Sequence, residues 1–173
     1  MKSIRICSVA AILIGVVGCA TPPVVVAPVG PNPANVASAA SMGSLQVFSQ
    51  MMVQNDDQNQ GGYGKYDWQQ HTDYNIYDLH GKLIMHVFNE TGHYAEAPKR
   101  IALPVGNYLV KAQAKDFFWA KVPVTIERGR TTRVHLDDNW KPATVTLKQD
   151  LVTMPNGNPV GWPAESTKKS GIN

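Results

Sequence analysis

The chain has 173 residues, a length typical of one domain, and 43% of them are hydrophobic while 17% are charged. This composition supplies one ordinary core and excludes a multidomain enzyme, a disulfide scaffold and a polytopic membrane protein. The net charge of +3 is small and dispersed, so we expect no nucleic-acid partner.

The N-terminus carries a positive and then apolar pattern that ends in a cysteine. Lys2 and Arg5 precede the apolar run 9–17, which is too short to cross a bilayer as a helix and is typical of a secretory signal. The run ends in the tetrapeptide VVGC, whose last residue is Cys19. This ending resembles the lipobox of bacterial lipoproteins.

The resemblance implies that residues 1–18 are a signal peptide and that Cys19 becomes the acylated N-terminus of the mature protein. The alternative is an ordinary signal peptide with an incidental cysteine. Cys7 lies inside the signal, so a mature lipoprotein would hold no free thiol and no disulfide. Ala20 stands where lipoproteins of the inner membrane carry Asp. The resemblance therefore points to the outer membrane, with the domain facing the periplasm or the exterior.

Residues 19–43 contain five prolines and no charge. Proline fixes φ and favours extended polyproline II, so this segment is expected to be a semi-rigid spacer between the membrane and the domain. Plain disorder is the alternative, and both descriptions place the segment outside the folded domain.

The pattern within residues 44–150 predicts an all-β domain. Apolar and polar residues alternate over 44–54, whereas 55–71 is a polar, glycine-rich loop. Further strands are expected at 72–79, 82–88, 99–103, 107–114, 121–127 and 131–137. These short strands without intervening helices predict an antiparallel β-sandwich of about seven strands.

Turn residues separate the predicted strands. A hairpin is expected at His80-Gly81, a turn at Pro104-Val105-Gly106 and another at Arg128-Gly129. Pro123 cannot donate a ladder hydrogen bond, so its strand is expected at a sheet edge. Residues 151–173, rich in Pro, Gly, Asn and Ser, are expected to form a flexible tail, in which Trp162 alone offers a docking contact.

Residues 98–137 resemble the second half of a transthyretin-like module, as found in carboxypeptidase regulatory-like and PEGA-type domains. The matching positions are Leu103, Pro104, Gly106, Tyr108, Gly129, Thr131, Val134 and Leu136. The segment 116–119 departs from the family, which more often has Gly followed by one aromatic residue. The resemblance implies a fold and transfers no active site.

No signature of catalysis occurs in the sequence. It lacks the serine elbow, the zinc-protease helix motif and the phosphate-binding loop, and no cysteine is available as a nucleophile. The five histidines show no zinc spacing and are expected at the surface, and residues 57–62 match a calcium loop incompletely. We therefore expect no enzyme activity, no metal and no cofactor.

The candidate binding residues are six aromatic side chains in two clusters. They are Tyr63, Tyr66 and Trp68 in the polar loop, and Phe117, Phe118 and Trp119 at a predicted strand crossover. Such rings either pack onto the domain or serve as exposed contacts. The leading hypothesis is a non-enzymatic, lipid-anchored envelope protein that contacts another protein, and the alternative is a module that binds glycans through the Tyr/Trp loop.

The lipobox generates the first testable prediction. Substituting Cys19→Ser removes the thiol that would receive the lipid, so an unacylated and uncleaved precursor should accumulate. Intact-mass measurement of the mature wild-type protein checks the premise. A free, unmodified N-terminus downstream of residue 19 would contradict it.

Overall fold

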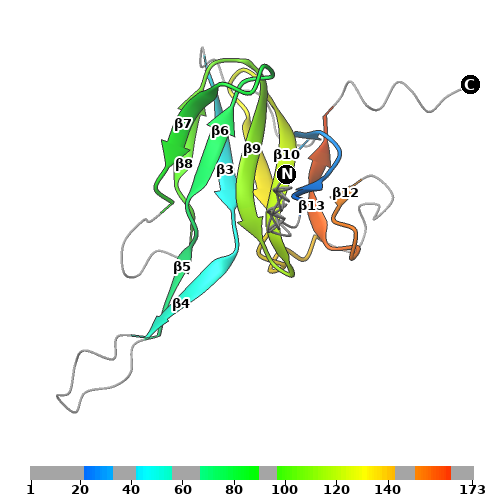
Figure 1. Ribbon diagram of the computed structural model, residues 1–173. Helices are drawn as coiled ribbons and strands as arrows, with labels where there is room; N and C mark the ends of the chain where they lie inside the picture. The colour runs from blue at the N-terminus through cyan, green and yellow to red at the C-terminus, as the bar shows by residue number, and fades with distance from the viewer. Residues whose placement is uncertain (1–21, 33–41, 56–66, 90–96, 143–150, 165–173) are drawn as a thin grey trace, which may run out of the picture.

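The computed structural model describes residues 22–32, 42–55, 67–89, 97–142 and 151–164. In these ranges the chain forms thirteen strands and no helix (Figure 1). The expected all-β sandwich is confirmed, with two sheets packed against each other and a two-stranded arm that projects from them. The predicted signal peptide and Cys19 lie outside the described residues, and no helix in the described ranges is long and apolar enough to span a membrane.

The larger sheet has eight strands in the order β12-β13-β2-β10-β9-β6-β7, and β1 pairs with β10 beside β2. Its strands are β1 (Val24–Val25), β2 (Val29–Gly30), β6 (Tyr74–Tyr77), β7 (Leu83–Val87), β9 (Gly106–Ala114), β10 (Phe117–Ile126), β12 (Val152–Thr153) and β13 (Pro159–Pro163). The smaller sheet consists of β11 (Thr131–His135), β3 (Gly43–Phe48) and β8 (Arg100–Leu103), and the arm pairs β4 (Met51–Asn55) with β5 (Asp67–His71).

The core forms because alternate residues of facing strands point inward. On the large sheet, Val110 and Ala112 of β9 lie opposite Val122 and Ala120 of β10, and all four are fully buried. Leu45 and Val47 of β3 and Val134 of β11 supply the facing layer. The predicted alternation in these strands is confirmed.

Two of the predicted turns have identifiable side-chain supports. Asp78 Oδ1 accepts hydrogen bonds of 2.9 Å from the backbone N–H groups of His80 and Lys82, and Gly81 adopts a φ of 82° that favours glycine. The turn at 104–106 carries the chain from the small sheet to the large one. There the Tyr108 hydroxyl donates a 3.1 Å hydrogen bond to the carbonyl of Pro104, which fixes the corner.

A buried asparagine joins the end of β7 to the small sheet. The Asn89 amide nitrogen donates to the carbonyl of Val47 at 3.0 Å and to the hydroxyl of Ser49 at 3.1 Å. Its amide oxygen accepts from the backbone N–H of Lys99 at 3.1 Å. Since polar groups this deeply buried need partners, these bonds hold the β7 side of the sandwich in place.

The predicted aromatic crossover at 116–119 is wrong. Strands β9 and β10 are adjacent and antiparallel, and Lys115 and Asp116 form the hairpin turn between them. Asp116 has a φ of 65°, a left-handed conformation that Asp tolerates better than most residues. A tight turn therefore replaces the expected connection between sheets.

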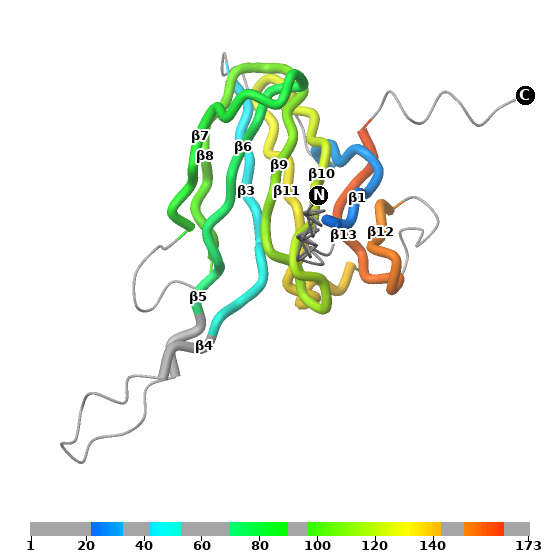
Figure 2. The backbone as a smooth tube through the Cα atoms, in the orientation of Figure 1, coloured from blue at the N-terminus to red at the C-terminus, as the bar shows by residue number. Residues whose placement is uncertain are grey.

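The predicted boundaries of the domain at residues 44 and 150 are also wrong. Within the expected spacer, β1 and β2 pair in parallel with β10, and Val29 is fully buried. Within the expected tail, β13 pairs with β2 and β12 pairs with β13 (Figure 2). The N-terminal flank joins the sheet because β10 has an open edge on the side away from β9, where β1 and β2 pair. The C-terminal flank follows, because β13 pairs with β2.

Pro123 does not lie in an edge strand. It occupies β10, which pairs with β9 on one side and with β1 and β2 on the other. On that second side, Val24 and Val25 of β1 pair with β10 as far as Lys121. The pairing then stops and resumes where Val29 of β2 lies opposite Val124. The missing N–H of Pro123 falls at this interruption, so no ladder bond is lost.

The predicted loop at 55–71 is shorter than expected. Its last five residues form β5, which pairs with β4 from Met51↔His71 to Asn55↔Asp67. Polar residues such as Gln69 and Gln70 do not show the apolar alternation by which the other strands were found. The pairing with β4, a long-range contact, is what makes this segment a strand.

Replacing Val29 should test whether the N-terminal flank belongs to the folded domain. Val29→Asp places an unpaired charge in the core and should lower the free energy of unfolding by about 3 kcal/mol or more. Val25→Asp is the matched control, because Val25 lies in the same flank but is 67% exposed. Urea unfolding of both variants measures the effect, and equal stabilities would contradict the assignment.

Candidate functional site

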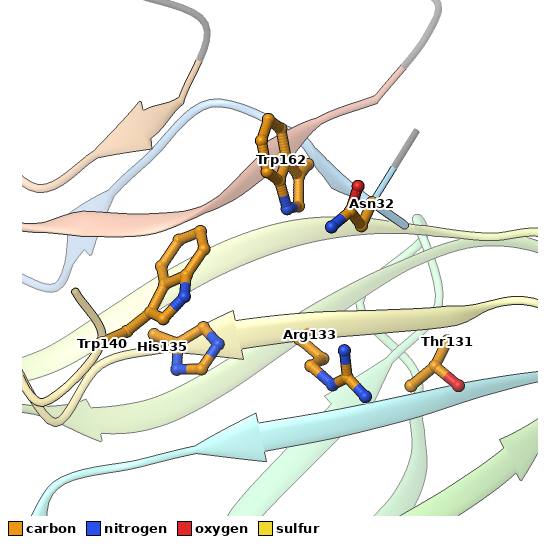
Figure 3. Close-up of a pocket in the computed structure, with 6 residues that line it drawn as sticks. All are labelled: Asn32, Thr131, Arg133, His135, Trp140 and Trp162. Atoms are coloured by element: carbon orange, nitrogen blue, oxygen red, sulfur yellow. The ribbon is translucent and has the colours of Figure 1, made fainter. Parts of the chain in front are cut away.

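A small cleft lies between the C-terminal strand β13 and the face of β11 that points away from the core (Figure 3). It encloses about 80 Å³. The lining residues come from three distant parts of the chain: Asn32, Thr131, Arg133, His135, Trp140 and Trp162. Thr131, Arg133 and His135 alternate on β11 with the buried Thr132 and Val134, so the strand itself aims them at the cleft.

The two tryptophans are placed by the backbone on either side. Trp162 lies on β13 opposite Gly30 of β2. A Cβ at position 30 would lie 2.9 Å from the Cα of Ala164, so glycine permits this close approach of the strands. Trp140 follows β11 after a turn in which Asp138 adopts a φ of 63°.

Aromatic rings form a stack that ends at the cleft. Phe48 and His135, paired across β3 and β11, stack with centroids 4.3 Å apart and planes at 16°. Trp140 covers the other side of His135 at 4.5 Å and 18°. Trp162 stands 6.4 Å from Trp140 at 65°, so the two indoles form an angled wall.

His135 is neutral at ordinary pH. Burial between the rings lowers its pKa to about 4, and the positive charge of Arg133 and the nearby His71 act in the same direction. The cleft therefore presents two indole faces, a neutral imidazole, the guanidinium of Arg133 and the polar side chains of Thr131 and Asn32. Such a combination has the chemistry to accommodate a flat or ring-shaped group that carries hydrogen-bonding atoms.

A second, more open groove of about 380 Å³ lies where the arm meets the outer face of the large sheet. The Asp73 carboxylate is 3.5 Å from His86 Nε2, and His86 Nδ1 is 2.7 Å from the amide oxygen of Asn75. Trp119 borders the groove, and Lys111 Nζ lies 5.0 Å from its ring centroid. Among the described residues, no group of three or more His, Cys, Asp and Glu side chains is arranged to hold a metal ion.

The predicted aromatic clusters are only partly assembled. Tyr63 and Tyr66 lie outside the described residues, and Trp68 is described only as a backbone position of β5. Phe117 packs against the core, whereas Phe118 is 72% exposed and meets Trp119 at 5.9 Å and 89°. The three consecutive rings are therefore divided between the two faces of the strand, because neighbouring side chains of an extended chain point to opposite sides.

The expectation that all histidines lie at the surface is wrong for two of them. His80 and His86 are exposed, and His93 lies outside the described residues. His71 is buried, with Nδ1 2.7 Å from the carbonyl oxygen of Ser49, and His135 is enclosed in the aromatic stack. His71 is buried with a hydrogen-bond partner for its ring nitrogen, whereas His135 is half-buried between two stacked rings.

The cleft residues were not predicted as a site. The alternation on β11 places Thr131, Arg133 and His135 on one outward face, and this was a readable signal. Nothing local indicated that Trp140 and Trp162, far apart in the sequence, would close over that face. Their meeting depends on the pairing of β13 with β2.

A third surface lies at β7, the last strand of the large sheet within the described residues. Leu83, Ile84 and Met85 are all exposed, and Leu79 and Phe88 flank them with exposed fractions of 68% and 66%. Among the described strands, only β6 pairs with β7. No charged residue occurs from Leu83 to Phe88.

Comparison with known proteins adds no assignment. No protein-family model matches the chain, and no curated protein or solved structure is detectably similar to it. The fold and its surfaces define a β-sandwich with an aromatic cleft and an exposed apolar edge. The resemblances to lipoproteins and to transthyretin-like modules stay predictions.

The stacked histidine makes the stability depend on pH. The folded pKa of His135, about 4, lies below the ordinary value of 6.5, so protonation favours the unfolded chain. Stability from the neutral ring is present above about pH 6.5 and should fall as the pH drops toward 4.

Replacement by phenylalanine, which keeps the stack and cannot titrate, isolates this contribution. Urea unfolding of wild type and His135→Phe between pH 7 and pH 4 should show the steeper loss in the wild type. Burial raises the pKa of Asp137, which acts in the opposite direction, but this contribution is common to both proteins. Parallel pH profiles would contradict the assignment.

Proposed function

We propose that this protein is a non-enzymatic, lipid-anchored protein of the cell envelope whose β-sandwich binds another protein. The exposed apolar edge at β7 is the observation that carries the protein-binding part. The Cys19 lipobox supports the anchor, and the absence of Asp after it supports the outer membrane. Neither the cleft nor the groove is needed for this role.

An apolar edge strand without charges or prolines favours contact with a partner strand. Natural sheets protect their edges with charges, prolines, bulges or covering segments, because unpaired N–H and C=O groups otherwise recruit other chains. Leu83, Ile84 and Met85 carry no charge or proline, and no further described strand covers them. The one such device is the register shift against β6, which leaves Ile84 as an extra residue on β7. A partner segment that adds to β7 would satisfy the backbone groups and cover the apolar side chains.

The side of the sandwich that bears β7 is also well supported from within. The hydrogen bonds of Asn89 hold the end of β7 to Val47 and Ser49 of the small sheet. The edge is therefore already ordered, and a partner does not have to supply the free energy for ordering it.

A second candidate function is glycan binding at the cleft. The angled indoles of Trp140 and Trp162 provide apolar faces for sugar rings, and Arg133 with Thr131 provides donors for hydroxyl groups. This site differs from the Tyr/Trp loop on which the glycan hypothesis first rested. The small volume of about 80 Å³ limits it to part of one sugar ring.

The edge hypothesis is tested by placing a charge on β7. Ile84→Lys should abolish a specific crosslink to an envelope protein in whole cells without lowering stability, since the side chain is exposed. Val105→Lys, an exposed apolar position in the 104–106 turn, is the matched control and should leave the crosslink intact.

Other outcomes of this experiment separate the two candidates. Recovery of the same crosslink at equal yield from Ile84→Lys would refute the edge. Crosslinking that soluble oligosaccharide displaces, and that Trp162→Ala abolishes, would favour the cleft instead.

A further inference from the structure

Two exposed apolar side chains and three half-buried basic or aromatic ones gather on the outer face of the large sheet next to β1. We define the outer patch as Val25, Lys111, Phe118, Trp119 and Lys121. Val25 of β1 pairs with Lys121 of β10, which in turn pairs with Lys111 of β9, so three strands present one row.

A bulge brings both aromatic residues to this row. The register of β10 against β9 shifts between Phe117 and Ala120, so an extra residue is accommodated there. Phe117 and Ala120 face the core, while Phe118 is exposed and Trp119 lies beneath the Lys111 ammonium at 5.0 Å. Phe118 and Val25, exposed by 72% and 67%, are the apolar residues of the patch.

The chemistry of the patch is apolar and cationic. The remaining outward positions of β9 and β10 are Asn107, Leu109, Gln113, Pro123 and Thr125, none of them acidic. Lys115 adds a further cation at the hairpin. The nearby Asp116 carboxylate lies in the turn itself and accepts from the Asn156 amide at 3.4 Å.

The length of chain before β1 limits the distance from the patch to Cys19. Val25 is six positions after Cys19, and even a fully extended chain spans at most about 3.6 Å per residue, or roughly 20 Å in all. Because β1 runs parallel to β10, its N-terminal end points toward Phe118 and Trp119 rather than away from them. A lipid on Cys19 therefore holds the bilayer within reach of the outer patch.

We propose that the outer patch rests on the membrane that anchors the protein. Phe118 and Val25 enter the interfacial region, Trp119 lies at the headgroup level, and Lys111 and Lys121 reach lipid phosphates. This inference rests on the proposed lipidation of Cys19. It leaves β7, which is separated from β10 by β9 and β6, available to a protein partner.

A single thiol at position 118 tests the orientation. The acylated mature chain has no other free thiol, so Phe118→Cys is labelled at one site with a polarity-sensitive fluorophore. Val105→Cys is the matched control, because Val105 is also exposed but precedes β9 at the opposite end of the β9–β10 hairpin. Both lipidated proteins are inserted into vesicles of phosphatidylethanolamine with a minority of phosphatidylglycerol.

The label at 118 should be several-fold less accessible to aqueous iodide than the label at 105, and nitroxide lipids should quench it selectively. Adding Val25→Asp should restore much of the iodide accessibility at 118. Equal accessibility of the two labels in a protein whose mass shows acylated Cys19 would overturn the orientation alone. An unmodified Cys19 would overturn the anchor and the orientation together.

Discussion

Strand β10 is the element on which the rest of the structure depends. It pairs with β9 along most of its length and with β1 and β2 on its other side, while its inner side chains Ala120, Val122 and Val124 are buried. The segment before the domain and the tail after it both reach the fold through this strand, directly for β2 and by way of β2 for β13. The aromatic cleft and the outer patch are therefore consequences of the same pairing, on different sides of it.

Local patterns predicted the strands whose two faces differ in environment. The alternation of apolar and polar residues predicted β9 and β10, because each face of a strand is set by every second residue. Turn residues such as Gly81 and Pro104 predicted the turns, because they favour particular backbone dihedral angles. Strand β5 and the flanking strands lacked that signal. Val24 and Val29 lie in a proline-rich segment, a composition that is typical of a spacer. They belong to the sheet because they pair with the edge of β10 that β9 does not occupy.

The candidate site likewise combines features that are local in the sequence with contacts between distant segments. The shared outward face of Thr131, Arg133 and His135 follows from their spacing on β11, whereas the closure by Trp162 depends on a contact with Gly30, far away in the sequence. The exposed state of Phe118 was predictable from steric limits on three consecutive rings, but its place beside β1 was not. Contacts between distant segments account for most of what sequence reasoning missed here.

The two ends of the large sheet differ in a way that limits assembly. One end is β7, a five-residue apolar strand, and the other is β12, which has only two residues and pairs irregularly with β13. The small sheet is tied to β2 on one side by the bridge between Pro31 and Thr132. Edge-to-edge stacking of the large sheet into fibres requires two complementary edges on that sheet, whereas one long edge permits a single pairing that then closes. Two molecules that paired through β7 would each cover the β7 edge of the other, so the large sheet would not extend beyond a dimer.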